Sequence, residues 1–70
     1  MDARQTLAAN IKRYRHAANL SQEELADRAQ LDRTYISALE RCIYAASIDK
    51  IERLAKALSV TPADLLTPHA

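Results

Sequence analysis

The feature that most restricts how this 70-residue chain can fold is the complete absence of glycine. Tight β-hairpin turns usually need glycine, because their central residues adopt positive φ, so a β-rich fold is disfavoured. The large apolar residues are mainly leucine and isoleucine, alanine is abundant, and tryptophan and phenylalanine are missing, which suits short helices packed closely together. We therefore expect an all-α fold, formed by one domain that spans residues 1–70.

The rest of the composition favours a cytoplasmic protein without a membrane anchor. The single cysteine, Cys42, cannot form an internal disulfide, so nothing indicates an oxidising compartment. No stretch approaches the roughly 20 apolar residues that a membrane span requires. The segment from Met1 to Gln5 leads into an amphipathic pattern and not into the apolar block of a signal peptide.

Hydrophobic spacing predicts five helices in a compact bundle. Leu7, Ile11, Tyr14 and Ala18 recur at intervals of three and four residues, as on one face of a helix, and Asn19 can end that helix in the left-handed conformation. The other segments follow from similar spacing and from capping signals. We expect the helices to span approximately residues 4–18, 21–29, 33–41, 48–58 and 62–66.

The second helix has a particularly clear start. Ser21 and Glu24 form a capping box, in which the Ser21 side chain accepts the third helical amide and Glu24 reaches back to the Ser21 amide. Leu20, just before the cap, is placed to pack on Leu25. The sequence therefore fixes where this helix begins.

Cap residues also precede the last three helices. Asp32 begins the third helix, Ser47 the fourth and Thr61 the fifth, where Asp64 closes a second capping box. In the fourth helix a regular apolar stripe is expected to face inward: Ile48, Ile51, Leu54, Ala55 and Leu58.

Two short helices lie between residues 21 and 41, joined by about three residues. Such a joint sets the helices at a steep angle, the helix-turn-helix arrangement, in which the second helix can enter the major groove of DNA. By spacing alone, a plain helical bundle explains the segment equally well. The net charge of +1 does not by itself indicate a nucleic-acid partner.

The residues of this segment favour the first interpretation. The chain reads LSQEELADRA over residues 20–29, YISALER over 35–41 and IERLAKALSVT over 51–61. This combination resembles the phage-repressor (lambda repressor-like, Xre) family, over about residues 7–66. The resemblance implies a five-helix domain that binds double-stranded DNA at palindromic operators as a homodimer. It is nearest to compact members such as small phage regulators and restriction-modification controller proteins.

The family pattern assigns base-reading roles to the third helix. Arg33 and Thr34, at its amino end, would point at base edges, and Ser37 and Ala38, one turn later, would line the same groove. The chemistry agrees, because Arg can donate two hydrogen bonds to guanine and Ala can pack on a thymine methyl. The alternative for Arg33 is a solvated residue in the first helical turn.

Other residues would contact the DNA backbone. The resemblance places Ser21 and Gln22 at a phosphate, with Gln22 also bracing the third helix. Tyr35 and Arg41 would meet the backbone at the edges of the groove. The alternative for Tyr35 is a partly buried spacer.

Arg15 and Glu40 are assigned a structural role. Both lie on helix faces that otherwise look inward, and the resemblance pairs them across the first and third helices. Neither charge would be tolerated alone in a buried setting. We expect this ion pair to fix the third helix on its support.

The chain departs from the family pattern in three places. Gln30 and Cys42 stand where glycine is common, and the loop after the third helix reads Ile43-Tyr44-Ala45-Ala46 where basic residues are usual. The apolar loop removes expected phosphate contacts, and Ile43 and Tyr44 are expected to pack on the core or on another protein.

We expect neither an enzyme nor a cofactor or metal site. The candidate metal ligands Cys42, His16 and His69 have no useful spacing, and no base is placed to activate the cysteine. Cys42 is interpreted as a small apolar filler. No small-molecule ligand is indicated.

Three functions are compatible with the expected fold. A transcriptional regulator explains the polar row Gln22, Arg33, Thr34 and Ser37. An antitoxin or adaptor would keep the fold but usually needs an extra partner-binding segment, and an inert bundle leaves the polar row unexplained. The sequence therefore favours a sequence-specific transcriptional regulator.

A dimer needs a self-complementary surface, and the fifth helix is the candidate. Val60, Leu65 and Leu66 follow the main core stripe, and so short a helix is not expected to bury both leucines. A two-fold axis there would place the two recognition helices about 34 Å apart, one turn of DNA. The alternative is that these residues only cover the core of one protomer.

Overall fold

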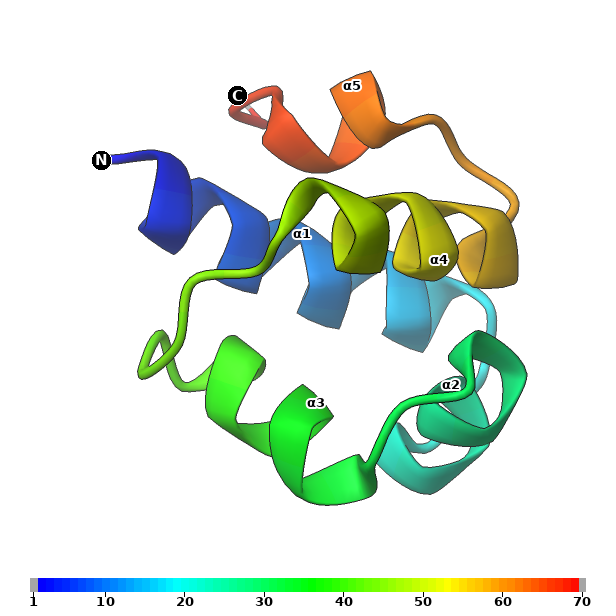
Figure 1. Ribbon diagram of the computed structural model, residues 1–70. Helices are drawn as coiled ribbons and strands as arrows, with labels where there is room; N and C mark the ends of the chain where they lie inside the picture. The colour runs from blue at the N-terminus through cyan, green and yellow to red at the C-terminus, as the bar shows by residue number, and fades with distance from the viewer. Residues whose placement is uncertain (1, 70) are drawn as a thin grey trace.

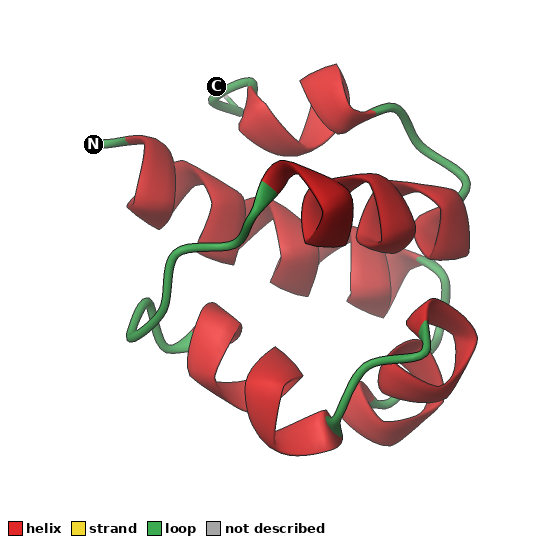
Figure 2. Cartoon of the chain, in the orientation of Figure 1, coloured by secondary structure: helices red, strands yellow, loops and turns green. Residues whose placement is uncertain are grey.

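The computed structural model describes residues 2–69. Within that range the chain forms five helices and no strand (Figure 2). They are α1 (Ala3–Ala17), α2 (Gln22–Ala29), α3 (Arg33–Glu40), α4 (Ile48–Leu58) and α5 (Pro62–Leu66). The all-α expectation is confirmed, and the predicted boundaries agree to within one residue. None of the described helices is long and apolar enough to cross a membrane.

The helices enclose a single core. In Figure 1, α1 and α4 cross the middle of the molecule, α5 covers one side, and α2 and α3 cover the opposite side. Contacts join α1 to α3, α4 and α5, and join α2 to α3 and α4. Each helix contributes one side chain with 0% exposure: Ile11, Leu25, Ile36, Leu54 and Leu65.

The predicted cap of α2 is present. The Glu24 amide donates to Ser21 Oγ at 3.0 Å, and the Ser21 amide donates to a Glu24 carboxylate oxygen at 2.9 Å. These two bonds hold the pKa of Glu24 below its usual value. Leu20 and Leu25 belong to the same buried cluster, as the staple interpretation requires.

The other helix starts are less uniform than expected. Thr61 and Asp64 form the predicted box on α5, and Ser47 accepts the Lys50 amide at 3.3 Å on α4. Asp32 stands at the cap position of α3, but its side chain makes no capping bond. A capping box that the sequence analysis missed, Asp2 with Gln5, begins α1.

The ends of α1 to α4 share one geometry without glycine. Positive φ occurs at the second residue after α1 and α3, Asn19 (58°) and Cys42 (61°), and at the first residue after α2 and α4, Gln30 (57°) and Ser59 (59°). The next amide donates to the carbonyl five residues earlier, as in the Schellman motif: Leu20 to Arg15, Leu31 to Ala26, Ile43 to Ala38 and Val60 to Ala55. Left-handed geometry costs a residue other than glycine about 1 kcal/mol, and asparagine tolerates it best.

One member of the predicted α4 stripe does not face inward. Ile48 is 76% exposed, whereas Ile51, Leu54, Ala55 and Leu58 are buried. Ile48 is the first residue of α4, and helical side chains lean toward the amino end. Its side chain therefore projects past the start of the helix, beyond the surface that the core covers.

A buried asparagine that the sequence analysis missed joins α1 to α5. Asn10 is 2% exposed, and its Nδ2 lies 2.8 Å from the carbonyl oxygen of Leu65 and 2.9 Å from that of Thr67. Its Oδ1 accepts from Arg13 at 3.1 Å. The side chain thus satisfies carbonyls at the end of α5 that have no partner within the helix.

Replacing Asn10 with alanine should lower the free energy of unfolding by about 1–3 kcal/mol, because the α5 carbonyls would remain buried without a donor. Urea denaturation measures the change. Arg13→Ala is the control, since it removes the half-buried partner of Asn10 and a cation–π contact with Tyr14 but leaves the α5 carbonyls their donor, and it should cost less than about 1 kcal/mol. Equal effects from the two variants would contradict the role of Asn10.

Candidate nucleic-acid interface

The helices α2 and α3 form a tight pair on one side of the molecule. Residues 30–32 join them, and the left-handed conformation of Gln30 turns the chain sharply after α2. The two helices pack on each other, and α3 runs along the outer edge of the molecule (Figure 1). The pair has the connection and packing of a helix-turn-helix.

The two sides of α3 differ strongly in solvent exposure. Ile36, Leu39 and Glu40 are buried, and their positions lie on one side of a helix with 100° per residue. On the opposite side Thr34 and Arg41 are exposed, and Ser37 is half-buried. Arg33 stands seven residues before Glu40, on the same side of the helix, but it is exposed because it lies in the first turn. The outward face of α3 therefore carries two of the four predicted base readers and one predicted phosphate contact, and Arg33 is exposed at its amino end.

Ala38 is the exception among the predicted base readers. It is only 8% exposed, so the protein itself covers almost all of its methyl group. An alanine so placed offers a thymine methyl very little surface. We correct the expectation and leave Ala38 out of the base-reading set.

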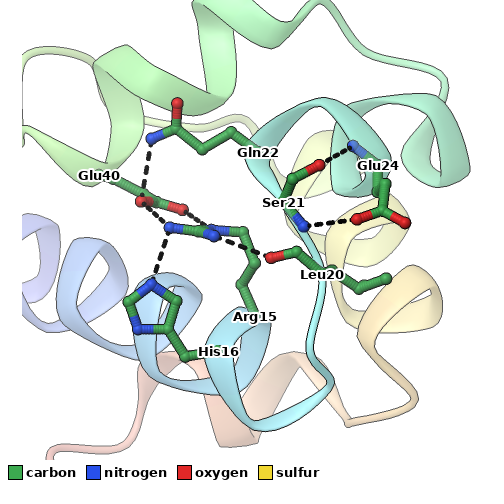
Figure 3. Close-up of polar contacts among 7 residues, drawn as sticks. All are labelled: Arg15, His16, Leu20, Ser21, Gln22, Glu24 and Glu40. Carbon is green, nitrogen blue, oxygen red and sulfur yellow. Dashed lines mark hydrogen bonds and ion pairs between the residues drawn. The ribbon is translucent and has the colours of Figure 1, made fainter.

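A buried ion pair fixes α3 to α1, as predicted (Figure 3). Arg15 Nε lies 2.6 Å from Glu40 Oε2, and Arg15 Nη2 lies 2.9 Å from Glu40 Oε1. Arg15 Nη1 donates to the Leu20 carbonyl at 2.8 Å, and Nη2 is 3.1 Å from His16 Nε2. This two-pronged geometry fixes both the position and the rotation of α3.

Gln22 extends this network from the start of α2. Its Nε2 donates to Glu40 Oε1 at 3.1 Å, so the predicted brace on the third helix is confirmed. In Figure 3 its side-chain oxygen points away from Glu40. Ser21 and Gln22 thus lie together at the amino end of α2, next to the third helix.

The network also shifts the pKa values of Glu40 and Arg15. Burial alone would raise the pKa of Glu40, but hydrogen bonds from Arg15 and Gln22, with the charges of Arg15 and Lys12, outweigh it and hold the pKa below its usual value. The hydrogen bond to Glu40 raises the pKa of Arg15 further. The pair is therefore fully ionised at neutral pH.

An aromatic cluster joins α3, the loop after it and α4. The rings of Tyr35 and Tyr44 are stacked with centroids 6.0 Å apart, and Lys50 Nζ lies 4.4 Å from the centroid of Tyr35. Partial burial raises the pKa of Tyr35. Lys50 was not predicted as a site residue, and the stack was not predicted either, because it depends on contacts between α3, the loop and α4.

Ile43 and Tyr44 do not pack on the core, although Ala46 of the same loop is partly buried against it. Ile43 is 49% exposed and Tyr44 is 52% exposed, so the first of the two expectations for this loop is wrong. Cys42, interpreted as a filler, is partly buried and holds the left-handed position at the start of the loop.

The predicted dimer residues differ sharply in exposure. Leu65 is 0% exposed and belongs to the protomer's own core, so it is not available to a partner and that expectation is corrected. Val60 is partly buried, and Leu66 is 44% exposed. Leu65 is buried because α5 packs on α1 and α4. Leu66 borders an open groove of about 380 Å³ whose apolar lining comes from Ala3, Leu7, Ala45, Ala46 and Ile51.

Residues 2–69 contain no candidate metal site. No group of three or more His, Cys, Asp or Glu side chains there is arranged to hold an ion.

The paired helices, the polar outer face of α3 and its buried anchor define a DNA-binding protein of the helix-turn-helix class. The family described as "Helix-turn-helix" (HTH_3) matches residues 11–65. The chain belongs to this family. This agrees with its resemblance to the phage repressors in sequence.

Named relatives agree with the family. A "Neisseria hypothetical transcription factor" from Neisseria meningitidis serogroup B is 45% identical over 67 residues, which are 96% of this chain but only 63% of that protein. The "Control protein C.SmaI" of Serratia marcescens is 43% identical over 96% of this chain and 80% of its own length. This chain thus spans less than two thirds of the first relative and most of the second.

Solved structures show the same architecture. The crystal structure of the hypothetical transcription factor NHTF from Neisseria aligns with a TM-score of 0.93 at 45% identity, covering 96% of this chain and 77% of that one. The restriction-modification controller protein C.AhdI from Aeromonas hydrophila aligns with a TM-score of 0.85 at 35% identity, covering 89% and 94%.

Proposed function

We propose that this protein is a sequence-specific transcriptional regulator that binds a palindromic operator as a homodimer, with α3 in the major groove. The observation that carries the proposal is the polar outer face of α3, held in a fixed orientation by the buried pair of Arg15 and Glu40. A helix locked in this way can present its side chains to base edges without first paying to become ordered. Such a regulator works where the genome lies, and we place it in the cytoplasm.

Three side chains of α3 are assigned to base reading. Arg33 and Thr34 are exposed at the amino end of α3, and Ser37 follows one turn later. Arg donates two parallel hydrogen bonds to guanine O6 and N7, and the hydroxyls of Thr and Ser can donate or accept. Sequence preference is therefore expected to depend most on Arg33.

The remaining polar residues are assigned to the backbone. Ser21 and Gln22 lie at the amino end of α2, where unpaired amides and the helix dipole favour a phosphate. Arg41 is exposed at the carboxyl end of α3, and Tyr35 lies at its flank. These contacts would set the register of α3 in the groove.

The homodimer is assigned to the α5 side of the molecule. Leu66 is an exposed residue of α5 beside an apolar groove. Val60, in the segment that joins α4 to α5, is partly buried. A single short recognition helix buries little surface on DNA, so two half-sites are needed for a tight and specific complex. A two-fold dimer is the commonest arrangement that supplies them.

Selection of bound sequences from random duplex DNA tests this function. We expect recovery of a short inverted repeat whose half-sites are about 10 base pairs apart, one turn of the helix. Recovery of unrelated sequences, bound as weakly as the starting pool, would rule out sequence-specific binding.

Arg33→Ala should weaken binding to the recovered operator by about 1–3 kcal/mol and relax the preference at one base pair in each half-site. Fluorescence anisotropy with single-base operator variants measures both effects. Arg53→Ala on α4 removes the same charge from an exposed position off α3 and is the control. An equal loss of affinity for operator and random DNA would show that Arg33 contacts only the backbone.

A further inference from the structure

The surface between the end of α2 and the outer side of α4 carries a group of positive charges. An open hollow of about 510 Å³ lies there, and its charged lining residues are Arg28 of α2 and Arg53 and Lys56 of α4. All three side chains are exposed, and no carboxylate of the described residues lines the hollow. We call this feature the basic hollow.

The chemistry of helix ends explains only part of this grouping. Arg28 and Lys56 lie in the last turns of α2 and α4, where the helix dipole favours a cation. Arg53 lies in the middle of α4, so the dipole gives no reason for its position. Cations that line one hollow repel one another, and the fold alone therefore does not account for all three.

The chain itself does not neutralise these cations. Within residues 2–69 the ion pair of Arg15 with Glu40 is the only one present. Arg28, Arg53 and Lys56 are therefore without a paired carboxylate in this part of the chain.

The neighbouring carboxylates lie outside the basic hollow. Asp49 and Glu52 line a second hollow nearer the start of α4, and the carboxylates of α2 line a third. Among the latter, Glu24 is near enough for the charge of Arg28 to help lower its pKa, but its carboxylate accepts from the Ser21 amide. The basic hollow is thus a local region of positive charge bordered by mixed charge.

The basic hollow also lies away from the surface assigned to DNA. None of its lining residues comes from α3. On α2, Arg28 stands six residues after Gln22, about 9 Å farther along the helix from the end that is assigned to a phosphate. The hollow therefore stays open to a partner when α3 occupies the major groove.

We propose that the basic hollow is a docking site for an acidic segment of a partner protein, one that carries several closely spaced carboxylates. Each arginine can hold a carboxylate through two parallel hydrogen bonds, and a single carboxylate would leave other cations unpaired. The lining between the cations includes Ala29 and Ala57, whose small side chains leave room for those of the partner. Gln30 and Ser59 also line the hollow and add neutral donors.

The charge pattern favours a protein segment over a second stretch of DNA. A duplex presents phosphates in a long regular row, so it needs an extended basic track. Beyond Arg53, the outer side of α4 instead carries Asp49 and Glu52, which would repel the next phosphates. A short acidic segment can pair with the three cations without reaching these carboxylates.

The test measures fluorescence anisotropy of a labelled peptide in which glutamate and serine alternate, mixed with the intact chain. We expect this peptide to bind and to shift the backbone amide NMR signals of residues 28–30 and 53–59, whereas a matching peptide with glutamine in place of glutamate should not bind. Arg53→Glu should weaken binding of the acidic peptide about tenfold or more, because repulsion replaces a charge-assisted hydrogen bond.

Two further variants make the result specific. Arg4→Glu makes the same change of charge at an exposed position of α1 outside the hollow, and it should change the affinity less than about twofold because salt screens distant charges. Arg28→Gln, on the other helix, should weaken binding about fivefold. Thermal melting of each variant shows which of them retain the fold.

Three outcomes would overturn the inference. Equal losses for Arg53→Glu and Arg4→Glu would show only general charge attraction. If inorganic phosphate shifts the same amides and the peptide binds no more tightly than phosphate, the hollow is an anion site only. If Arg53→Glu weakens operator binding as much as Arg33→Ala does, the hollow contacts DNA. Failure to select any operator would contradict the proposed function alone, because peptide binding is measured on the free protein.

Discussion

Replacing Glu40 with alanine should lower the free energy of unfolding by about 3–5 kcal/mol, because the Arg15 guanidinium would remain buried without its partner. Arg15 is 9% exposed and makes two of its bonds to Glu40. Urea denaturation measures the loss. Glu52→Ala on the exposed side of α4 removes a carboxylate without a buried partner and serves as the control.

The double variant Arg15→Met/Glu40→Leu separates stability from positioning. Removing both charges leaves no unpaired charge, but the Leu20 carbonyl and Gln22 Nε2 lose their partners, so only part of the lost stability should return. Operator affinity should remain lower than in the wild type, because the two-pronged contact that sets the rotation of α3 is gone. A loss below about 0.5 kcal/mol for Glu40→Ala would show an exposed and dispensable pair.

The pair also makes stability depend on pH. The folded-state pKa of Glu40 is lowered, so the unfolded chain binds a proton more readily and folding is favoured when the carboxylate is ionised. The contribution is therefore complete above the ordinary glutamate range and is lost as pH falls through about 4.5 toward the lower folded value. In Glu40→Gln this acid-side loss should be smaller than in the wild type.

Leu66→Glu should convert the protein to a monomer at tens of micromolar and weaken operator binding by about 100-fold or more, because each half-site would then bind alone. Leu66 is 44% exposed, so the substitution places a charge at the proposed interface without entering the core. Analytical ultracentrifugation of wild type and variant measures the assembly.

His69→Glu provides the control for this experiment. It adds the same charge three residues farther along the chain and removes no apolar contact, so the dimer should persist. If the wild type itself sediments as a monomer at tens of micromolar without DNA, the surface around Leu66 is not a stable dimer interface.

Local signals made most of the fold predictable. The capping boxes of Ser21 with Glu24 and Thr61 with Asp64 are short-range hydrogen bonds, and so the sequence alone could place them. Asp32 shows the limit of such reasoning, since a residue of the correct type stands at the cap and makes no bond. The capping preference is statistical, whereas the bond depends on one side-chain rotamer.

Features that join distant elements were harder to predict. The stack of Tyr35 with Tyr44 depends on where the loop returns, and Leu65 is buried because α1 and α4 lie beneath α5. Asn10 could have been predicted from the sequence. It stands between Leu7 and Ile11 on an apolar face, and a buried amide there must find backbone partners.

The four glycine-free helix ends have a consequence for the unfolded chain. Glycine is the residue with the greatest backbone freedom, so a chain without it has less conformational entropy to lose when it folds. This smaller loss of conformational entropy offsets part of the free energy that is needed to hold Gln30, Cys42 and Ser59 at positive φ. The sharp turn between α2 and α3 is therefore specified by the Leu31-to-Ala26 hydrogen bond and by packing, and the protein obtains a precise joint from a comparatively stiff backbone.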